Sequence, residues 1–484
     1  MDRRALTLLC LLLACGSADA GGPAASSEGG DEAVAPADPN LRRLIELAGS
    51  EGREGEALPL AQELRDELTE ATEPRREAIA DAMGRAVIAV EGTAGIANRL
   101  RIELLRGLGE SEAEAARAPL TIIARRRRAD QSFLFNRVAL ELLGERREEA
   151  NIDVLIDGLF LCDAANPAMR MNDVAVVGLA QLGEAAVEPL LQVLSGRRPG
   201  VSELADDYVA LVIARTGPGY APTARHVMVS EALGALGFVG HPSALEPLLA
   251  KGRDDDAVVR LEAMMALASV RPRLDDSEPI RQAWMRIYAD ATDVQQQAHL
   301  LAIARRLADP ALAPFLLEVA EESSVDPSLR LGAAHGYALI VPASDPAFGR
   351  LVRRNRDIRP QLTELAPLVA EADRCSELPC WIQAFQEHAA AVDAPLAEKA
   401  AMQIAQLGRG DPRAVSALVA KLGHRDMGVR LAALRALDLV ATRGSAAAVQ
   451  RIDELRESEE GRAIWNQFAR EALPVRARLI ARAR

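Results

Sequence analysis

Hydrophobic residues follow a helical spacing along most of this chain, from about residue 41 to residue 484. Gly, Pro and Asp interrupt the pattern at intervals and mark the ends of short helices. No stretch shows the sustained alternation of hydrophobic and polar positions that is typical of a β-strand. The pattern therefore predicts an all-α protein.

The interruptions recur with a regular period. In most cases a leucine followed by a small or aliphatic residue ends the helix, and successive leucines of this kind are mostly 31 to 40 residues apart. These leucines are Leu108, Leu143, Leu182, Leu236, Leu267, Leu307, Leu339, Leu407 and Leu439. Periods of this size indicate supersecondary units that stack side by side and bury their hydrophobic faces against each other.

The clearest unit has a helix over residues 396–407, a turn over residues 408–412 and a second helix over residues 414–422. We expect Gly408 to end the first helix in the left-handed conformation and Asp411 to cap the second. Each unit is therefore predicted to be a hairpin of two helices.

The turns, the Leu-Leu helices that follow them and the Val-Arg-Leu starts at Val259 and Val429 resemble the HEAT-repeat family. The resemblance implies an α-α superhelix, a HEAT-like α-solenoid, with a long groove that binds a protein or an extended peptide.

An aspartate precedes the arginine of these helix starts by four residues. The pairs are Asp256 with Arg260, Asp326 with Arg330, and Asp426 with Arg430. By the resemblance, these residues form a ladder that links neighbouring repeats through charge-assisted hydrogen bonds. The alternative is an ordinary pair on a solvated helix surface.

The predicted organisation has five parts. Residues 1–14 are a lipoprotein signal peptide, 15–40 a disordered linker, 41–93 a helical N-terminal cap, 94–460 the HEAT-like repeat array, and 461–484 a C-terminal capping helix. The linker consists largely of Gly, Ala, Ser, Pro and acidic residues, which supply too little hydrophobic surface to fold.

The start of the chain is typical of an export signal. A charged segment precedes an apolar run that ends at Cys15 and is too short to span a membrane. Leu12-Leu13-Ala14-Cys15 resembles the bacterial lipobox, which implies that Cys15 carries a lipid; a plain secretory signal is the alternative. We therefore expect an extracytoplasmic protein anchored to a bacterial membrane. Gly16, in place of the Asp that retains some lipoproteins at the inner membrane, favours the outer membrane.

Charge and composition narrow the choice of partner. The net charge of −13 disfavours nucleic acid, since phosphate binding needs clustered positive charge. Aromatic residues make up only 3% of the chain, which disfavours β-sandwiches and barrels.

One departure from the repeat period lies at residues 195–225, a segment rich in Pro and Gly. Exposed Tyr and Arg are favoured contact residues at interfaces, so this insertion is a candidate partner-binding protrusion. Its candidate contact residues are Arg197, Arg198, Tyr208 and Tyr220. The alternative is a tolerated surface insertion.

A second departure contains Cys375 and Cys380, which flank a predicted turn between two helices. We expect a structural disulfide, which an extracytoplasmic location permits. The alternative, a redox or metal site, lacks the Cys-x-x-Cys spacing, and His388 alone cannot complete a zinc shell.

The sequence contains no recognisable catalytic, metal-binding or cofactor-binding motif. We therefore expect no cofactor and no enzymatic activity. The predicted function is a protein–protein interaction scaffold on the bacterial envelope. The alternatives are a HEAT-like enzyme that resembles the bilin lyases and a purely structural subunit of an envelope assembly.

Overall fold

The structure is a computed structural model that describes residues 38–92, 95–126, 132–274, 276–343, 345–457 and 459–483. Regular structure in these ranges is helical, apart from one isolated β-bridge between Cys162 and Arg170. The helices pack in successive pairs, so the prediction of an all-α, HEAT-like solenoid is confirmed. Cys15, the predicted signal peptide and nearly all of the predicted linker lie outside the described residues.

The turns between paired helices follow the predicted chemistry with one correction. The Asp411 carboxylate accepts a hydrogen bond from the Arg413 backbone N–H and caps the next helix. The left-handed residue of this turn is Gly410, with φ of 76°, whereas Gly408 has φ of −103°. Gly408 is required for a different reason, because a Cβ at this position would lie 2.8 Å from the Ala414 Cβ.

The described chain divides into two compact units. Unit 1 comprises the residues up to Ala175 together with Glu203–Pro222. Its helices are α2 (Pro39–Ala48), α3 (Glu54–Leu68), α4 (Glu73–Ala89), α5 (Gly95–Glu110), α6 (Arg117–Arg125), α7 (Phe133–Glu145), α8 (Ile152–Gly158) and most of α11 (Val201–Thr216). Helices α3, α5 and α7 pack in sequence as one layer, and α2, α4, α6 and α8 form the other.

Unit 2 comprises Val176–Ser202 and Thr223–Arg484. Its helices are most of α9 (Asn172–Leu182), α10 (Val187–Leu194), α12 (Ala224–Val239), α13 (Leu245–Lys251), α14 (Ala257–Val270), α15 (Glu278–Asp290), α16 (Val294–Leu307), α17 (Ala313–Glu321), α18 (Pro327–Ile340), α19 (Pro346–Arg354), α20 (Arg359–Ala370), α21 (Leu378–Ala391), α22 (Ala394–Leu407), α23 (Pro412–Val419), α24 (Met427–Val440), α25 (Ala446–Glu457) and α26 (Glu459–Arg482). Helices α12, α14, α16 and α18 pack in sequence as one layer.

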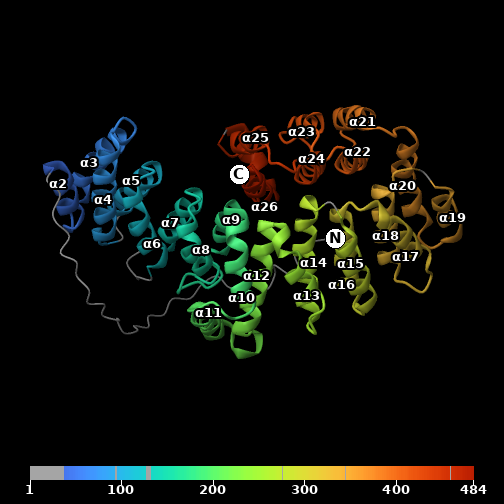
Figure 1. Ribbon diagram of the computed structural model, residues 1–484, viewed down its shortest axis with the longest axis horizontal. Helices are drawn as coiled ribbons and strands as arrows, with labels where there is room; N and C mark the ends of the chain where they lie inside the picture. The colour runs from blue at the N-terminus through green and yellow to red at the C-terminus, as the bar shows by residue number, and fades with distance from the viewer. Residues whose placement is uncertain are drawn as a thin grey trace. The chain divides into compact units, whose positions relative to one another are not determined.

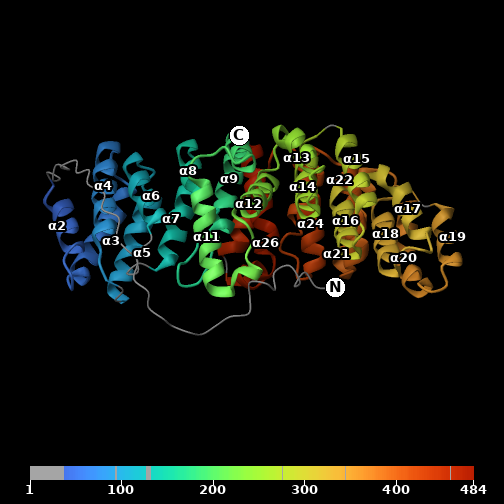
Figure 2. The same cartoon turned by 90° about the horizontal axis from the view of Figure 1, so that it is seen from below.

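The array in unit 2 doubles back on itself (Figures 1 and 2). Helix α22 packs on α18, and α26 packs on α12, which lies far earlier in the sequence. The Arg478 guanidinium of α26 donates a hydrogen bond of 3.3 Å to the Phe238 carbonyl, 240 residues away. Helix α24 packs against the short 3₁₀ helix η7 (Arg271–Arg273), which follows α14.

Polar side chains of α22 stabilise its contact with the C-terminal end of α18. The last carbonyls of a helix have no partner within the helix and must bond elsewhere. Lys399 Nζ donates to the carbonyls of Ala338, at 2.9 Å, and Val341, at 2.5 Å, and Gln403 Nε2 donates to the Leu339 carbonyl at 3.3 Å. Lys399 is fully buried, so these carbonyls replace its hydration shell.

One helical stretch among the described residues, Asn172–Leu194, has the length and apolar composition of a membrane span. It is 61% buried within the folded protein, as the core helices of globular proteins also are.

Candidate functional site

Helices α14 and α18 of unit 2 present equivalent stripes of side chains, and α16 packs between them. The helix starts at Val259 and Leu329 are equivalent repeat positions. By the same alignment, each of three residues of α14 has an equivalent in α18: Val258 and Ser328, Glu262 and Gly332, and Met265 and His335. Helix α16, which packs between α14 and α18, contributes Val294, Ala298, Leu301, Ala302 and Arg305. We call these residues together the α14–α18 face.

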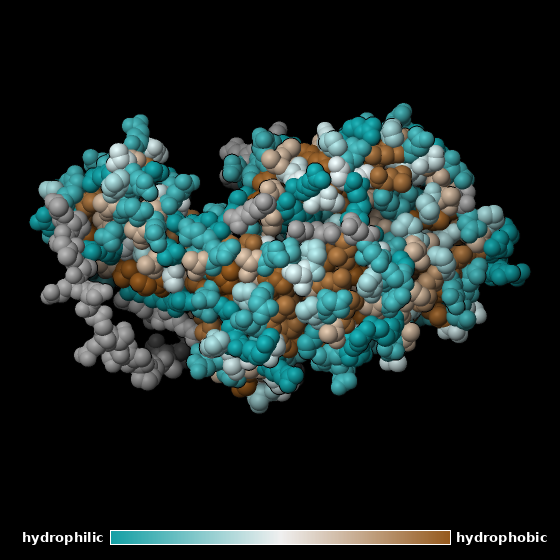
Figure 3. All heavy atoms as spheres, in the orientation of Figure 1, coloured by the Kyte–Doolittle hydropathy of each residue, from teal (hydrophilic) through white to brown (hydrophobic). Residues whose placement is uncertain are grey.

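The α14–α18 face exposes hydrophobic side chains. Val258, Met265 and Val294 are 42%, 47% and 46% exposed. Figure 3 shows hydrophobic residues gathered over α12, α14 and α16 in unit 2. Solvent-exposed hydrophobic groups grouped on one surface, with charged groups beside them, are typical of a binding site.

A pocket of about 140 Å³ lies between α16 and α18 on this face. Its lining residues are Ala298, Leu301, Ala302, Arg305, Ser328, Gly332 and His335. Small residues at Ala298, Ala302 and Gly332 leave the space open, and Arg305 and His335 make one end of it polar.

Arg305 and His335 interact directly, with 3.3 Å between the Arg305 Nη1 and the His335 Nδ1. Burial lowers the pKa of His335, and the positive charge of Arg305 lowers it further, against the opposing effect of Glu398 on α22. A neutral imidazole can accept the Arg305 hydrogen bond at Nδ1 and then carries its proton at Nε2. The pocket thus combines one permanent positive charge with a neutral histidine.

The other end of the face is acidic. The Ser230 hydroxyl of α12 donates a hydrogen bond of 2.8 Å to the Glu262 Oε1. Burial raises the pKa of Glu262, and its Oε2 has no hydrogen-bond partner within the described part of the chain.

A second, more polar pocket of about 350 Å³ lies at the turn before α14. Arg260 lines it and donates hydrogen bonds to the carbonyls of Asp254 and Asp255, at 2.8 and 2.9 Å. These bonds hold the turn together, so Arg260 is part of the local structure.

The predicted ladder residues have a different arrangement from the one expected. Asp256, Asp326 and Asp426 are the N-caps of α14, α18 and α24, and each accepts a hydrogen bond from a backbone N–H of its own helix. Arg260 and Arg430 donate hydrogen bonds to carbonyls of the preceding turn. Arg330 does reach the next repeat, where Asp357 accepts its hydrogen bond at 2.8 Å.

The insertion residues are divided between the units. Arg197 and Arg198 belong to unit 2, whereas Tyr208 belongs to unit 1 and the side chain of Tyr220 lies outside the described residues. The Arg170 guanidinium stacks 4.5 Å from the centre of the Tyr208 ring, so Tyr208 packs within its own unit. The structure therefore does not place these four residues on one common surface.

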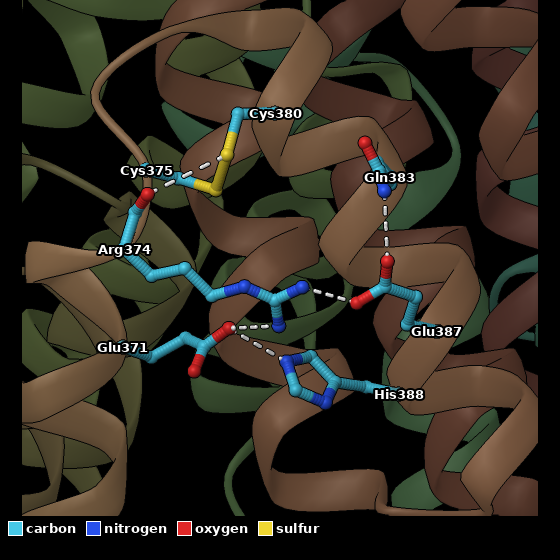
Figure 4. Close-up of a disulfide and its surroundings, with 7 residues drawn as sticks. All are labelled: Glu371, Arg374, Cys375, Cys380, Gln383, Glu387 and His388. Atoms are coloured by element: carbon cyan, nitrogen blue, oxygen red, sulfur yellow. Dashed lines mark hydrogen bonds and ion pairs between the residues drawn. A yellow bond between two sulfur atoms is a disulfide. The ribbon is translucent and has the colours of Figure 1, made fainter.

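Cys375 and Cys380 are joined by a disulfide between the end of α20 and the start of α21 (Figure 4). Beside it, Glu371 Oε1 interacts with Arg374 at 3.1 Å and with the His388 Nε2 at 2.8 Å, and Arg374 also pairs with Glu387. These contacts connect α20 with α21, the two helices that precede the C-terminal layer of α22, α24 and α26.

We expect the disulfide to stabilise unit 2 modestly. Because it closes a very short loop, its removal in a Cys375→Ala/Cys380→Ala variant is expected to lower the free energy of unfolding by about 2 kcal/mol. Chemical denaturation with and without reductant measures this effect. Reductant should destabilise the wild type and leave the double variant unchanged; equal responses of the two proteins would contradict the prediction.

Among the described residues, no group of three or more His, Cys, Asp or Glu side chains is placed to hold a metal ion. The site that the sequence missed is the α14–α18 face. Its residues belong to ordinary helix surfaces, and the signal that identifies them is the equivalence of repeat positions between α14 and α18.

No protein-family model matches the chain. Over 151 residues it is 34% identical to the phycocyanobilin lyase subunit beta of Thermosynechococcus vestitus, a match that covers 31% of this chain and 56% of that protein. The chain therefore spans little more than half the length of this relative.

Two solved structures also match the chain. The complex of CpcE and CpcF of phycocyanin lyase from Nostoc sp. PCC7120 is 16% identical, with a TM-score of 0.25, and the match covers 72% of this chain and 100% of that chain. Importin beta is 15% identical, with a TM-score of 0.33, and the match covers 91% and 66% of the two chains. The fold assignment itself depends on the helix pairs described above.

The prediction that the chain has no enzymatic activity is contradicted by its sequence similarity to a lyase subunit. That prediction depended on finding no catalytic motif. In a repeat protein, side chains from successive helices converge on a shared surface, so a reactive site need not leave a contiguous motif in the sequence.

Proposed function

We propose that the α14–α18 face of unit 2 binds a segment of a protein partner. The observations that carry this proposal are the exposed hydrophobic side chains of Val258, Met265 and Val294 on α14 and α16, and the Arg305–His335 pocket between α16 and α18. Hydrophobic contacts supply affinity at such surfaces, and the charged groups beside them fix the position of the partner.

Photo-crosslinking tests this proposal. A photoreactive amino acid at Met265 in the full chain should give one defined crosslinked protein in the native envelope, whereas the same residue at Ile122 of unit 1, also 47% exposed, should not. A Val258→Asp substitution should reduce the Met265 crosslink at least about fivefold, because a buried charge at an interface opposes binding. Equal crosslinking from Met265 and Ile122 would contradict the proposal.

We also propose that the protein is extracytoplasmic and attached through a lipid on Cys15 to a bacterial membrane, with the outer membrane favoured. The lipobox-like Leu12-Leu13-Ala14-Cys15 supports this proposal, and so does the Cys375–Cys380 disulfide, which an oxidising compartment permits. Mass spectrometry of the N-terminal peptide should show a diacylglycerol modification, and a Cys15→Ala variant should lose it and leave the membrane fraction.

The second candidate function is that of a bilin lyase, which the match to the phycocyanobilin lyase subunit favours. A lyase of this class is expected to change the visible absorbance of phycocyanobilin on binding. Spectra of phycocyanobilin with and without the purified full chain test this candidate, and unchanged spectra at saturating protein would remove it.

A further inference from the structure

The last turn of α16 carries an exposed arginine at a position that is buried in the neighbouring helices. Helices α14, α16 and α18 each follow a capping aspartate and each have 14 residues, so their positions align directly. Arg306 of α16 then corresponds to Ser269 of α14 and Leu339 of α18. Ser269 and Leu339 are buried, whereas Arg306 is exposed. Solvent therefore reaches α16 at a level where α14 and α18 are covered.

Charged groups of α24 and α26 lie around this arginine. Burial lowers the pKa of Arg306, and the positive charge of Arg478 lowers it further. Arg435 has a smaller effect in the same direction, whereas Glu471 and Asp438 act in the opposite direction. Arg306 is thus open to solvent and at the same time partly enclosed by helices of the C-terminal layer. We call Arg306 and these four residues the Arg306 junction.

Positive charge at the junction exceeds what its carboxylates neutralise. Asp438 accepts a hydrogen bond of 2.6 Å from Arg478 and is shared with a second arginine of α26. Arg435 lies 3.8 Å from Glu398 of α22, a separation longer than a hydrogen bond. In the part of the chain that the structure describes, the Arg306 side chain forms no hydrogen bond or ion pair. The guanidiniums of Arg306 and Arg435 therefore keep N–H groups that can bind an anion.

We propose that the Arg306 junction binds the carboxylate group of a small acid or of a peptide, between Arg306 of α16 and Arg435 of α24. A guanidinium presents paired N–H donors that match the two oxygens of a carboxylate. Asp438, Glu471 and Glu398 lie in the same region and repel additional negative charge. Phosphate, which carries more than one charge, is therefore matched less well than a carboxylate. The inference does not depend on the partner proposed for the α14–α18 face.

A carboxylate bound at this place links two layers of unit 2 (Figure 1). Arg306 belongs to the layer of α12, α14, α16 and α18, and Arg435 belongs to the C-terminal layer. Contacts to both residues exist together only while unit 2 is doubled back. The ligand therefore stabilises the doubled-back arrangement by binding to it, and the effect grows with ligand concentration.

The test is saturation-transfer NMR of small ligands with the purified full chain in detergent. The probe is propionate, and propionamide, which has nearly the same shape without the charge, is the control. Propionate should bind at least about tenfold more tightly than propionamide. It should also raise the midpoint of thermal unfolding, because it binds the folded form. A short peptide with a free C-terminus, compared with the same peptide amidated, shows whether the junction also accepts the carboxylate of a peptide.

Variants of the two arginines locate the site. Arg306→Gln and Arg435→Gln should each weaken propionate binding at least about tenfold, and Arg306→Lys should restore part of it. The matched control is Arg354→Gln, because Arg354 is also an exposed arginine in the last turn of a helix, α19. This control should bind propionate as the wild type does.

Several results would overturn the inference. These are equal binding of propionate and propionamide, tighter binding of inorganic phosphate than of propionate, and unchanged binding in the folded Arg306→Gln or Arg435→Gln variant. The wild-type comparisons need no variant, so they decide the question even if one substitution prevents folding. A negative result here leaves the Met265 crosslink unaffected, whereas failure of the proposed function would remove that crosslink.

Discussion

Raising the pH from 7 to 10 is expected to increase the free energy of unfolding of unit 2. Lys399 is responsible, because its burial in the contact between α22 and α18 lowers its pKa from 10.5 to about 7, against a weaker opposing effect of Glu371. Such a fall corresponds to about 5 kcal/mol from well below pH 7 to well above pH 10.5, and about 3.5 kcal/mol of it is expected between pH 7 and pH 10.

The direction of this pH dependence follows from the number of protons bound by the folded and the unfolded state. Between about pH 7 and pH 10.5, unfolded Lys399 is protonated and folded Lys399 is largely neutral, so the unfolded state binds more protons and stability rises with pH. Below pH 7 both states are protonated and this dependence ends. A neutral amine still has two N–H groups, so it keeps its hydrogen bonds to the carbonyls of Ala338 and Val341.

Urea denaturation at a series of pH values measures the effect. A Lys399→Met variant should lose the rise between pH 7 and pH 10, whereas Lys421→Met, at a half-buried lysine outside this contact, should keep it. Identical pH profiles for the wild type and Lys399→Met would show that Lys399 is not buried as described.

Replacing Asp438 by Asn is expected to be among the most destabilising single substitutions in unit 2. Asp438 accepts hydrogen bonds from Arg478 Nη2 at 2.6 Å and Arg482 Nη2 at 2.9 Å, and the two arginine side chains are only 4% and 1% exposed. Burial alone would raise the pKa of Asp438, but the two arginines outweigh it and hold the pKa below 3.8. Asp438→Asn removes the buried negative charge that both arginines share, at a cost of about 3–5 kcal/mol.

The matched control is Asp453→Asn, since Asp453 also pairs with an arginine of α26, Arg476, at 2.6 Å. This pair is more exposed, so the expected loss is about 1 kcal/mol or less. Calorimetric or urea unfolding of the two variants compares them directly. Equal losses would contradict the account of a buried clamp between α24 and α26.

The helical pairs could be predicted from the sequence because they depend on local signals. The spacing of leucines and the capping aspartates act within one repeat, and the structure confirms the hairpins they predict. The reversal of unit 2 depends on contacts between residues far apart in the chain. Lys399 looks like an ordinary surface lysine in the sequence, and nothing near it indicates the carbonyls at the end of α18 that it bonds.

The candidate site was less predictable than the fold. Tyr and Arg in the insertion indicated a binding surface, but Tyr208 is occupied by its stacking contact with Arg170. The α14–α18 face consists of common residue types such as Val, Met, Ala and Ser, whose significance depends on which helix surface remains exposed after packing. That outcome is decided by the arrangement of the layers and not by the local sequence.

The central claim is that unit 2 doubles back, so that α26 lies against α12. The most direct test is the distance between two spin labels, measured by pulsed electron paramagnetic resonance. The labels are carried by unnatural amino acids at Ser243, just after α12, and at Ala483, at the end of α26, so the native cysteines remain unchanged. The account predicts a narrow distribution at short distance in the full chain, because the Arg478 guanidinium bonds the Phe238 carbonyl. A long or broad distribution, as in an open array with α26 at its far end, would contradict it.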